Sequence, residues 1–354
     1  MMLNEKYVSD SIELLKAMIA IPSLSREEDN VATMIEKKLK DFGYQPNRVG
    51  NNIWLKSRNW DSYKPIILFN SHIDTVRPAK GWSYEPFSAT EENGKITGLG
   101  SNDAGASVVA LLAAFRHLEV VEQPYNLIFC ASAEEEISGL NGVVSVLEHF
   151  GKIELAVVGE PTQMQMAIAE KGLLVLDCEA KGKSGHAARN EGENAIYKAI
   201  KDIEVLKSFE FPLKSPMLGN VKMTVTQIEA GSQHNVVPDS CHFVVDVRTN
   251  ECYSNEEAFQ IISGLIISEV EPRSFRLNSS GIDPNHPLVK RGLAMGLTTY
   301  GSPTTSDQAV IPFPSIKIGP GDSARSHTAD EYIYEEEISD GIKIYIYLIN
   351  QLAF

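Results

Sequence analysis

The hydrophobic positions at the start of the chain follow the spacing of amphipathic helices. Residues 1–25 carry apolar side chains between charges at three- and four-residue intervals, which predicts a helix. A second helical pattern covers residues 31–42 and stops at Gly43. Ser25 and Glu28 form a capping-box pattern ahead of it, so we expect these two side chains to cap the second helix.

Short runs that are apolar at every position follow, over residues 66–69, 127–130 and 155–158. Such runs fit the central strands of a sheet that helices cover on both faces. Residues 104–118 have the pattern of a helix and lie between the first two runs. This alternation of strand and helix predicts an α/β layer fold.

The pattern changes near residue 170, where longer and half-exposed strands alternate with helices. The expected strands cover residues 172–182, 222–230 and 241–248, and the expected helices cover 194–209 and 255–270. A small sheet with helices on one face accounts for these elements, so this part of the chain is predicted to be an α+β domain.

The α/β pattern returns towards the C-terminus, with a helix over residues 287–299, a strand over 315–318 and a final helix. We therefore expect one α/β domain, a mixed sheet between helices, that an inserted domain interrupts. The expected boundaries are 1–168 and 281–354 for the α/β domain and 169–280 for the insertion.

The net negative charge of the chain bears on which kinds of molecule the protein can bind. The formal net charge is −15 at pH 7, and a surface of this sign repels nucleic acid and anionic membranes, so we expect neither as a partner. No apolar run approaches the roughly 18 residues that cross a bilayer. The four cysteines show neither a CxxC pair nor a disulfide framework, which favours reduced thiols and a cytoplasmic location.

Side chains of the metal-binding types follow the ends of several expected strands. In an open α/β sheet the ligand site lies at the carboxyl ends of the strands, so these side chains should converge. A set of His, Asp and Glu at one place is what a dinuclear zinc site needs, with one carboxylate able to bridge. The candidates are His72 with Asp74, Asp103, Glu134–Glu136, Glu160 and His327.

Each candidate has a simpler explanation when it is taken alone. A pair such as His72 and Asp74 is commonly a surface pair, and acids such as Glu134–Glu136 suit the start of a helix. Glu160 would serve as a turn residue and His327 as a loop histidine. The repetition of the pattern at five separate junctions favours the metal centre over these explanations.

The motifs around these residues resemble a known family. SHIDTV, GLGSNDAGASVVALL, ASAEEEISG, VVGEPT, GKSGHAA and SHTADEY are similar, in this order, to the motifs of the acetylornithine deacetylase / succinyl-diaminopimelate desuccinylase family. That family also includes aminoacylases, glutamate-releasing carboxypeptidases and dipeptidases. The resemblance covers nearly the whole chain. It implies a zinc-peptidase-like sheet and an inserted, ferredoxin-like domain that serves as lid and dimer interface.

The resemblance also implies roles for the candidate residues. It assigns two zinc ions, although cobalt or manganese can occupy such sites. Glu135 matches the general base, and Asp74 matches the residue that hydrogen-bonds a ligand histidine and fixes its tautomer. The family usually has Asp where this chain has Glu134. The implied ligands are His72 and Glu160 for one ion, Glu136 and His327 for the other, and Asp103 as the bridge.

Three residues of the inserted domain match substrate-side positions of the family. His186 matches a histidine that reaches the other subunit's active site and stabilises the oxyanion, which implies a homodimer through this domain. Asn235 and Arg248 match positions that bind the substrate carboxylate or its oxyanion. Arginine suits bidentate recognition of a carboxylate, but a surface ion pair at a strand end would also explain Arg248.

The expected reaction is hydrolysis of the amide bond of a small N-acyl amino acid. The C-terminal motifs are more similar to those of acetylornithine deacetylases than to those of diaminopimelate desuccinylases. This favours N-acetylornithine, or N-acetyl- or N-succinyl-citrulline, as the substrate, and a role in arginine biosynthesis. A succinyl-diaminopimelate desuccinylase and a dipeptidase of the same family stay open as alternatives. A succinyl group would add a carboxylate that needs a cation, and Lys171, Lys183 and Arg189 are the candidates for that role. A non-catalytic relative would lack a ligand or the base, and every such position is filled here.

Overall fold

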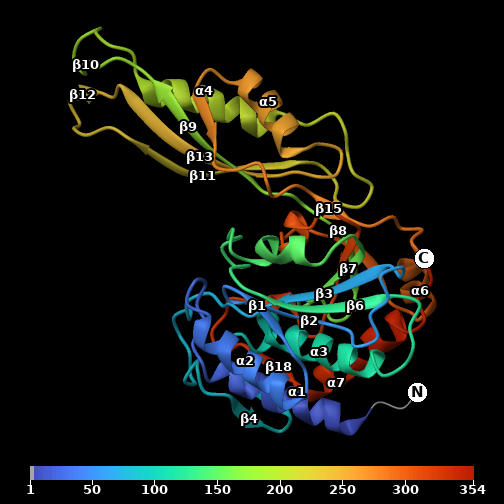
Figure 1. The fold of residues 1–354 in the computed structure, drawn as a ribbon. Helices are drawn as coiled ribbons and strands as arrows, with labels where there is room; N and C mark the ends of the chain where they lie inside the picture. The colour runs from blue at the N-terminus through green and yellow to red at the C-terminus, as the bar shows by residue number, and fades with distance from the viewer. Residues whose placement is uncertain (1–3) are drawn as a thin grey trace. The chain divides into compact units, whose positions relative to one another are not determined.

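The computed structural model describes residues 4–354, which divide into two compact units (Figure 1). The first unit comprises the chain up to Ile168 together with Gly281–Tyr300 and Ser306–Phe354. The second comprises Ala169–Ser280 and Gly301–Thr305. The short segment Gly301–Thr305 was expected in the α/β domain and instead groups with the second unit.

A nine-stranded mixed sheet forms the centre of the first unit, and most of its strands follow the order β1-β2-β6-β3-β7-β17-β8. The neighbours β6, β3, β7 and β17 are parallel, whereas β2 and β8 pair antiparallel with β6 and β17. β3 and β6 are buried at every residue, as expected for central strands. The strands are β1 (Asn47–Val49), β2 (Asn52–Lys56), β3 (Ile66–His72), β6 (Asn126–Ser132), β7 (Ile153–Val158), β8 (Met166–Glu170), β15 (Ser280–Gly281), β16 (Thr299–Ser302) and β17 (Ser315–Lys317).

Helices cover the faces of this sheet. Every residue of α3 is buried, because α1 and α7 pack against it, and Figure 1 shows these three helices on one side of the sheet. On the other face Trp54 and Leu68 pack against a short helical segment, η2. The helical elements are α1 (Glu5–Ile19), α2 (Asp29–Asp41), α3 (Ala106–Leu118), α6 (Pro287–Ala294), α7 (Glu335–Ile349), η1 (Ser101–Gly105), η2 (Val143–His149), η3 (Asp307–Val310) and η4 (Ser323–Arg325).

A small antiparallel sheet joins two segments that are far apart in the sequence. Its strands β4 (Thr90–Glu92), β5 (Lys95–Thr97) and β18 (Tyr332–Tyr334) pair in the order β18-β5-β4. The pairing of β18 with β5 brings the segment that ends the His327 loop beside the segment that leads to Asp103. This small sheet therefore holds the segments that carry two candidate ligands, Asp103 and His327, beside each other.

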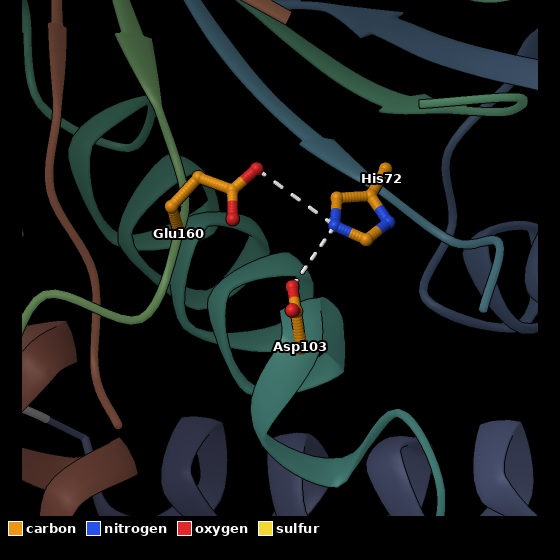
Figure 2. A group of neighbouring side chains, drawn as sticks. All are labelled: His72, Asp103 and Glu160. Atoms are coloured by element: carbon orange, nitrogen blue, oxygen red, sulfur yellow. Dashed lines mark hydrogen bonds and ion pairs between the residues drawn. The ribbon is translucent and has the colours of Figure 1, made fainter. Parts of the chain in front are cut away.

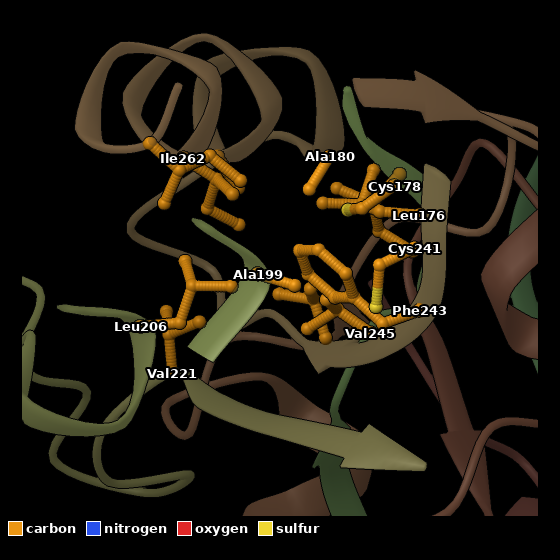
Figure 3. Close-up of a cluster of buried hydrophobic side chains, with 14 of the residues drawn as sticks. Leu176, Cys178, Ala180, Ala199, Leu206, Val221, Cys241, Phe243, Val245 and Ile262 are labelled. Atoms are coloured by element: carbon orange, nitrogen blue, oxygen red, sulfur yellow. The ribbon is translucent and has the colours of Figure 1, made fainter. Parts of the chain in front are cut away.

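The second unit is a four-stranded antiparallel sheet with helices on one face. Buried and exposed residues alternate along β9, as expected for a half-covered sheet. Figure 3 shows the core between this sheet and its helices, which includes Phe243 and Ile262. The elements are β9 (Leu174–Lys181), β11 (Lys222–Ala230), β13 (Ser240–Arg248), β14 (Glu269–Pro272), α4 (Ala195–Ser208) and α5 (Asn255–Leu265), with β10 (Gly185–His186) and β12 (Val236–Val237) as a separate pair.

The structure confirms the fold class, α/β with a separate antiparallel α+β part, and corrects several element ends. α5 ends at Leu265 instead of residue 270, because Glu269–Pro272 leaves the helix to pair with β9. α6 ends at Ala294 instead of residue 299, where strand β16 begins. Residues 1–3 of the first predicted helix lie outside the described residues. No helix in the described part of the chain has the length and apolar character needed to span a membrane.

The predicted capping box of the second helix is wrong. Helix α2 begins after Glu28, and no side chain caps it. The Ser25 hydroxyl instead donates to the Asp74 carboxylate at 2.7 Å, and the Glu28 carboxylate accepts the Arg26 backbone N–H at 2.7 Å. Both side chains of the pattern are thus used for contacts near the candidate site.

Candidate metal centre

The parallel strands place the candidate ligands at one edge of the central sheet. His72 is the last residue of β3, and Glu160 follows β7 by two residues. Glu136 follows the end of β6, and Asp103 lies in the short segment before α3. Because β3, β6 and β7 are parallel neighbours, their carboxyl ends meet and the side chains that follow them come together.

Three of these side chains form a first group of potential ligands (Figure 2). His72 Nε2 lies 3.3 Å from Asp103 Oδ1 and 3.8 Å from Glu160 Oε1. One ligand atom from each residue lies within 4.8 Å of the others, which is close enough for all three to bind one ion. Figure 2 shows the histidine ring and the two carboxylates directed at the same point.

A second group shares one residue with the first. His327 Nε2 lies 3.0 Å from Glu136 Oε2 and 3.6 Å from Asp103 Oδ2. The two oxygens of Asp103 thus face different histidines, since Oδ1 is the one near His72. A carboxylate placed in this way can bridge two metal ions.

The ionisation of these groups also suits a bound cation. Burial raises the pKa of Glu160 to about 8, and the nearby Asp103 carboxylate adds to the rise. The hydrogen bond with Glu136 raises the pKa of His327 to about 9. Neighbouring buried carboxylates repel each other when both are ionised. A bound cation favours their ionised form, in which they can act as ligands. The donor set of two imidazoles and three carboxylates suits zinc, cobalt or manganese.

Asp74 contacts His72 and also holds the acidic loop that follows β6. The nearest acceptor for His72 Nδ1 is the backbone carbonyl of Asp74, at 3.0 Å, while the Asp74 carboxylate is 3.5 Å away. That carboxylate accepts the backbone N–H groups of Glu135 and Glu136 at 3.0 and 3.1 Å. Asp74 therefore contacts His72 through its main chain and its carboxylate, and the same carboxylate holds the acidic loop.

Glu135 points towards the same cluster. Its Oε2 lies 3.9 Å from His72 Nε2. Burial raises the pKa of Glu135 well above its usual range, and the neighbouring Glu160 contributes to the rise. A carboxylate with a raised pKa near two groups of ligands is suited to accept and release a proton.

Glu134, the position at which the chain departs from the family pattern, has a structural role. Its φ is +54°, and its carboxylate accepts the Asn141 side-chain amide at 2.9 Å. A Cβ on Gly139 would overlap the Glu134 carboxylate, so only glycine fits there. The Glu134 N–H donates to the buried Glu28 carboxylate at 3.2 Å, which holds the start of the acidic loop.

Two further buried acids support the site and were not predicted from the sequence. Glu331 accepts the backbone N–H groups of Gly100, Asn102 and Asp103 at 3.2, 2.8 and 2.9 Å. Asp307 accepts side-chain hydrogen bonds from residues in β3 and β6, at 2.7 and 2.8 Å. The only sequence signal was the position of Glu331 in the motif that contains His327.

The structure brings together two of the three predicted substrate-side residues. β10 and β12 pair His186 with Val236, next to Asn235, whose carbonyl accepts the Ala187 N–H at 3.0 Å. Arg248 lies at the end of β13, and its Nε and Nη2 donate to the Asp246 carboxylate at 2.8 and 3.0 Å. The bidentate face that suits a substrate carboxylate is thus directed at Asp246.

Comparisons with known proteins agree with this geometry. Residues 68–351 match the description "peptidase family M20/M25/M40". The chain is similar to aminopeptidase PepT from Bacillus cereus, at 18% identity and a TM-score of 0.78, covering 98% of this chain and 99% of that one. It is similar to an M20 family metallo-carboxypeptidase from Sulfolobus solfataricus, at 17% identity and 0.74, covering 97% and 99%. A dinuclear metal-binding M20 peptidase from Bacillus subtilis matches at 15% identity and 0.72, covering 98% of each chain. At these identities the likeness establishes the fold.

Proposed function

The chain belongs to peptidase family M20/M25/M40, a family of metal-dependent hydrolases, and on this premise we propose that it deacylates a small N-acyl amino acid. The proposed substrates are N-acetylornithine and N-acylated citrulline, in the synthesis of arginine. The proposed location is the cytoplasm, and Cys130, Cys178, Cys241 and Cys252 are all free thiols, which agrees with it.

The observation that carries the proposal is the position of Asp103 between two groups of ligands, with Glu135 beside them. We assign His72 and Glu160 to one metal ion, with Asp103 as the bridge. Glu136 and His327 are assigned to the second ion. When bound, two such ions would acidify the attacking water and polarise the amide carbonyl.

The residues of the chain then carry the proton transfers. Glu135 accepts the proton of the attacking water on a carboxylate oxygen and delivers it to the leaving amide nitrogen. Asp74 holds the main chain of Glu135 and Glu136, so that the base keeps its direction during the transfer. The departing amine and the carboxylic acid are the two products.

We also propose that the protein acts as a homodimer in which His186 stabilises the oxyanion in the partner's site, with Asn235 and Arg248 on the substrate. The support is the family resemblance and the exposure of the His186 side chain in the β10–β12 pair. Mixing Glu135→Ala with His186→Ala after subunit exchange tests this directly. An action in trans would restore about one quarter of wild-type activity, because half of the dimers then hold one complete site. A mixture that stays inactive contradicts it.

A second candidate function is hydrolysis of short peptides. The similar solved structures are described as an aminopeptidase and a carboxypeptidase, and an amide bond is cleaved in either reaction. The test compares N-acetyl- and N-succinyl-ornithine and the matching citrullines with an unblocked dipeptide and tripeptide, using zinc-loaded protein and a chelator control. Chelator-sensitive cleavage of an acyl amino acid supports the first proposal. Cleavage of the peptides alone supports the second and overturns the first.

A further inference from the structure

The two histidines of the candidate metal centre differ in how they are held. His72 is the last residue of β3 and its side chain is 1% exposed, whereas the side chain of His327 is 54% exposed. His327 also has a φ of +60°, in the left-handed region that a residue other than glycine rarely adopts. Its imidazole contacts Glu136 and Asp103, which are themselves candidate ligands. The position of His327 therefore depends on the groups that hold its loop.

The loop that carries His327 covers residues 326–331, from the end of η4 to the start of β18. Ahead of this loop, the Asn102 side chain holds the backbone of Asp322. Asn102 Oδ1 accepts the Asp322 N–H at 2.9 Å, and Asn102 Nδ2 donates to the Asp322 carbonyl at 3.1 Å. Since Asn102 is the neighbour of Asp103, the turn before the loop is tied to the segment of the proposed bridging ligand.

Arg325, the last residue of η4, joins the start of the loop to the elements that follow its end. Its Nη1 donates to Glu337 Oε2 at 2.8 Å, and its guanidinium carbon lies 4.4 Å from the centre of the Tyr332 ring. Tyr332 is the first residue of β18, directly after the loop, and Glu337 lies in the first turn of α7. These three residues, Arg325, Tyr332 and Glu337, close the loop at its base, and we name them the loop clamp.

The two partners of the arginine are themselves held by the fold. Glu337 Oε2 also accepts the backbone N–H of Tyr334 at 2.9 Å, and the next residue of α7, Ile338, is buried. Tyr332 pairs with Thr97 in the small sheet, and α7 packs against α3. Because the partners belong to a strand and a packed helix, they hold the arginine, and with it the start of the loop, in one place.

The contact between Arg325 and Glu337 differs from an ordinary surface ion pair. Their side chains are 19% and 25% exposed, so solvent screens their attraction less than that of a fully exposed pair. A planar guanidinium can donate to a carboxylate and stack on an aromatic ring at the same time, and a lysine ammonium lacks this combination. The clamp therefore uses a property that is specific to arginine.

We propose that Arg325 is a positioning residue for the metal centre, and that it holds the backbone of His327, two residues away, in the orientation that the second metal ion requires. This inference rests on the proposed assignment of His327 and Glu136 to that ion. His72 is held by β3 and does not depend on the clamp. Loss of the clamp should therefore weaken binding of the second ion and leave binding of the first unchanged.

The test titrates zinc into metal-free protein in competition with a coloured chelator, for wild type, Arg325→Gln and Arg325→Lys. The dissociation constant of the second ion should rise about 10- to 100-fold in Arg325→Gln, the usual cost of losing a residue that orients a ligand, while that of the first changes less than about threefold. Arg325→Lys keeps the charge and should recover part of the loss. The His327→Ala variant, which should keep one ion, identifies the second ion.

Arg116→Gln is the matched control, because Arg116 makes the same kinds of contact away from the site. It lies in the last turn of α3, at the opposite end of that helix from Asp103, and its Nη1 donates to Asp10 at 2.9 Å. Its guanidinium carbon lies 3.8 Å from the centre of the Phe42 ring. The control should lose thermal stability and keep both zinc dissociation constants of the wild type. An equal change of zinc binding in the control and in Arg325→Gln would reflect a general loss of stability, and it would overturn the proposal.

Glu337→Gln removes the charged partner of Arg325 and supplies a second measurement if Arg325→Gln does not fold. It should also weaken the second ion, and the double variant should lose less than the product of the two single losses, because the two residues form one contact. Wild-type zinc binding in Arg325→Gln, or in Glu337→Gln where Arg325→Gln does not fold, refutes the role of Arg325.

The His327→Ala variant separates this inference from the proposed function. If His327→Ala keeps both ions, the proposed ligand assignment has failed, and the role of Arg325 fails with it. If His327→Ala loses one ion and Arg325→Gln loses none, the ligand assignment stands and the role of Arg325 alone is refuted.

Discussion

Replacing Glu331 by Gln tests whether a buried carboxylate holds the bridging ligand in place. Glu331 Oε1 accepts the N–H groups of Asn102 and Asp103, and Oε2 accepts that of Gly100. Glutamine has nearly the same shape but only one acceptor oxygen. In either orientation of its amide, at least one of these buried N–H groups faces an NH₂ donor and loses its acceptor.

The loss of stability in Glu331→Gln follows from the number of N–H groups that lose their acceptor. A buried N–H without a partner costs about 1–3 kcal/mol, and each N–H that still reaches the amide oxygen has a neutral acceptor instead of a charged one. For a unit of this size, that loss lowers Tm by roughly 2–12 °C. Because the Asp103 main chain is among the groups released, we also expect zinc affinity to fall by about 10- to 100-fold, the usual cost of losing a residue that orients a ligand.

The assay is thermal unfolding and zinc content after dialysis against a zinc buffer, for wild type and Glu331→Gln. Glu92→Gln is the control, because Glu92 is an exposed acid in β4, a strand of the small sheet whose strand β18 begins directly after Glu331. The control should match the wild type in both measurements. If Glu331→Gln also matches the wild type in Tm and in zinc content, Glu331 does not hold the Asp103 loop and the reasoning fails.

Three other predictions concern the same site. The Glu135→Ala variant should keep its metal while its activity falls by about 10²–10⁴-fold, since only proton transfer is lost. Loss of zinc from that variant would show that Glu135 is a metal ligand and not the base. Asp103→Ala should reduce bound metal, and two-metal occupancy by elemental analysis would contradict its bridging role. Without metal, burial keeps Glu160, Glu331 and Asp307 protonated, with pKa values of about 8, 7 and 6, and the bond with Glu136 raises that of His327 to about 9. All four groups bind their protons more tightly in the folded protein than in the unfolded chain, so Tm in chelator should fall as pH rises from about 6 to about 9, and a flat profile would refute this.

The α/β layers and the candidate ligands could be predicted because both depend on local pattern. A run such as residues 66–69 is apolar on both faces, and the rule that ligands gather at the carboxyl ends of parallel strands then places His72 and Glu160 together. The ends of α5 and α6 could not be predicted, because strand pairing by Glu269–Pro272 and by β16 competes with helix formation there.

The supporting acids could not be predicted because their partners are distant in sequence. Glu331 accepts from backbone groups about 230 positions away, and Glu28 from the N–H of Glu134, 106 positions away. Nothing in the local sequence distinguishes such an acid from one on the surface. Ser25 shows the same limit, since its local pattern favoured a helix cap while its hydroxyl donates to Asp74.

Two of the loops that carry candidate ligands are each fixed by a buried carboxylate that accepts main-chain N–H groups. Asp74 holds the Glu135–Glu136 loop in this way, and Glu331 holds the Asp103 loop. This arrangement places negative charge behind ligands that are themselves negative. Buried carboxylates in such numbers repel one another unless a cation is present or protons are taken up. Metal ions bound here would therefore stabilise the loops that bind them, so that loading the site and ordering it are one coupled equilibrium.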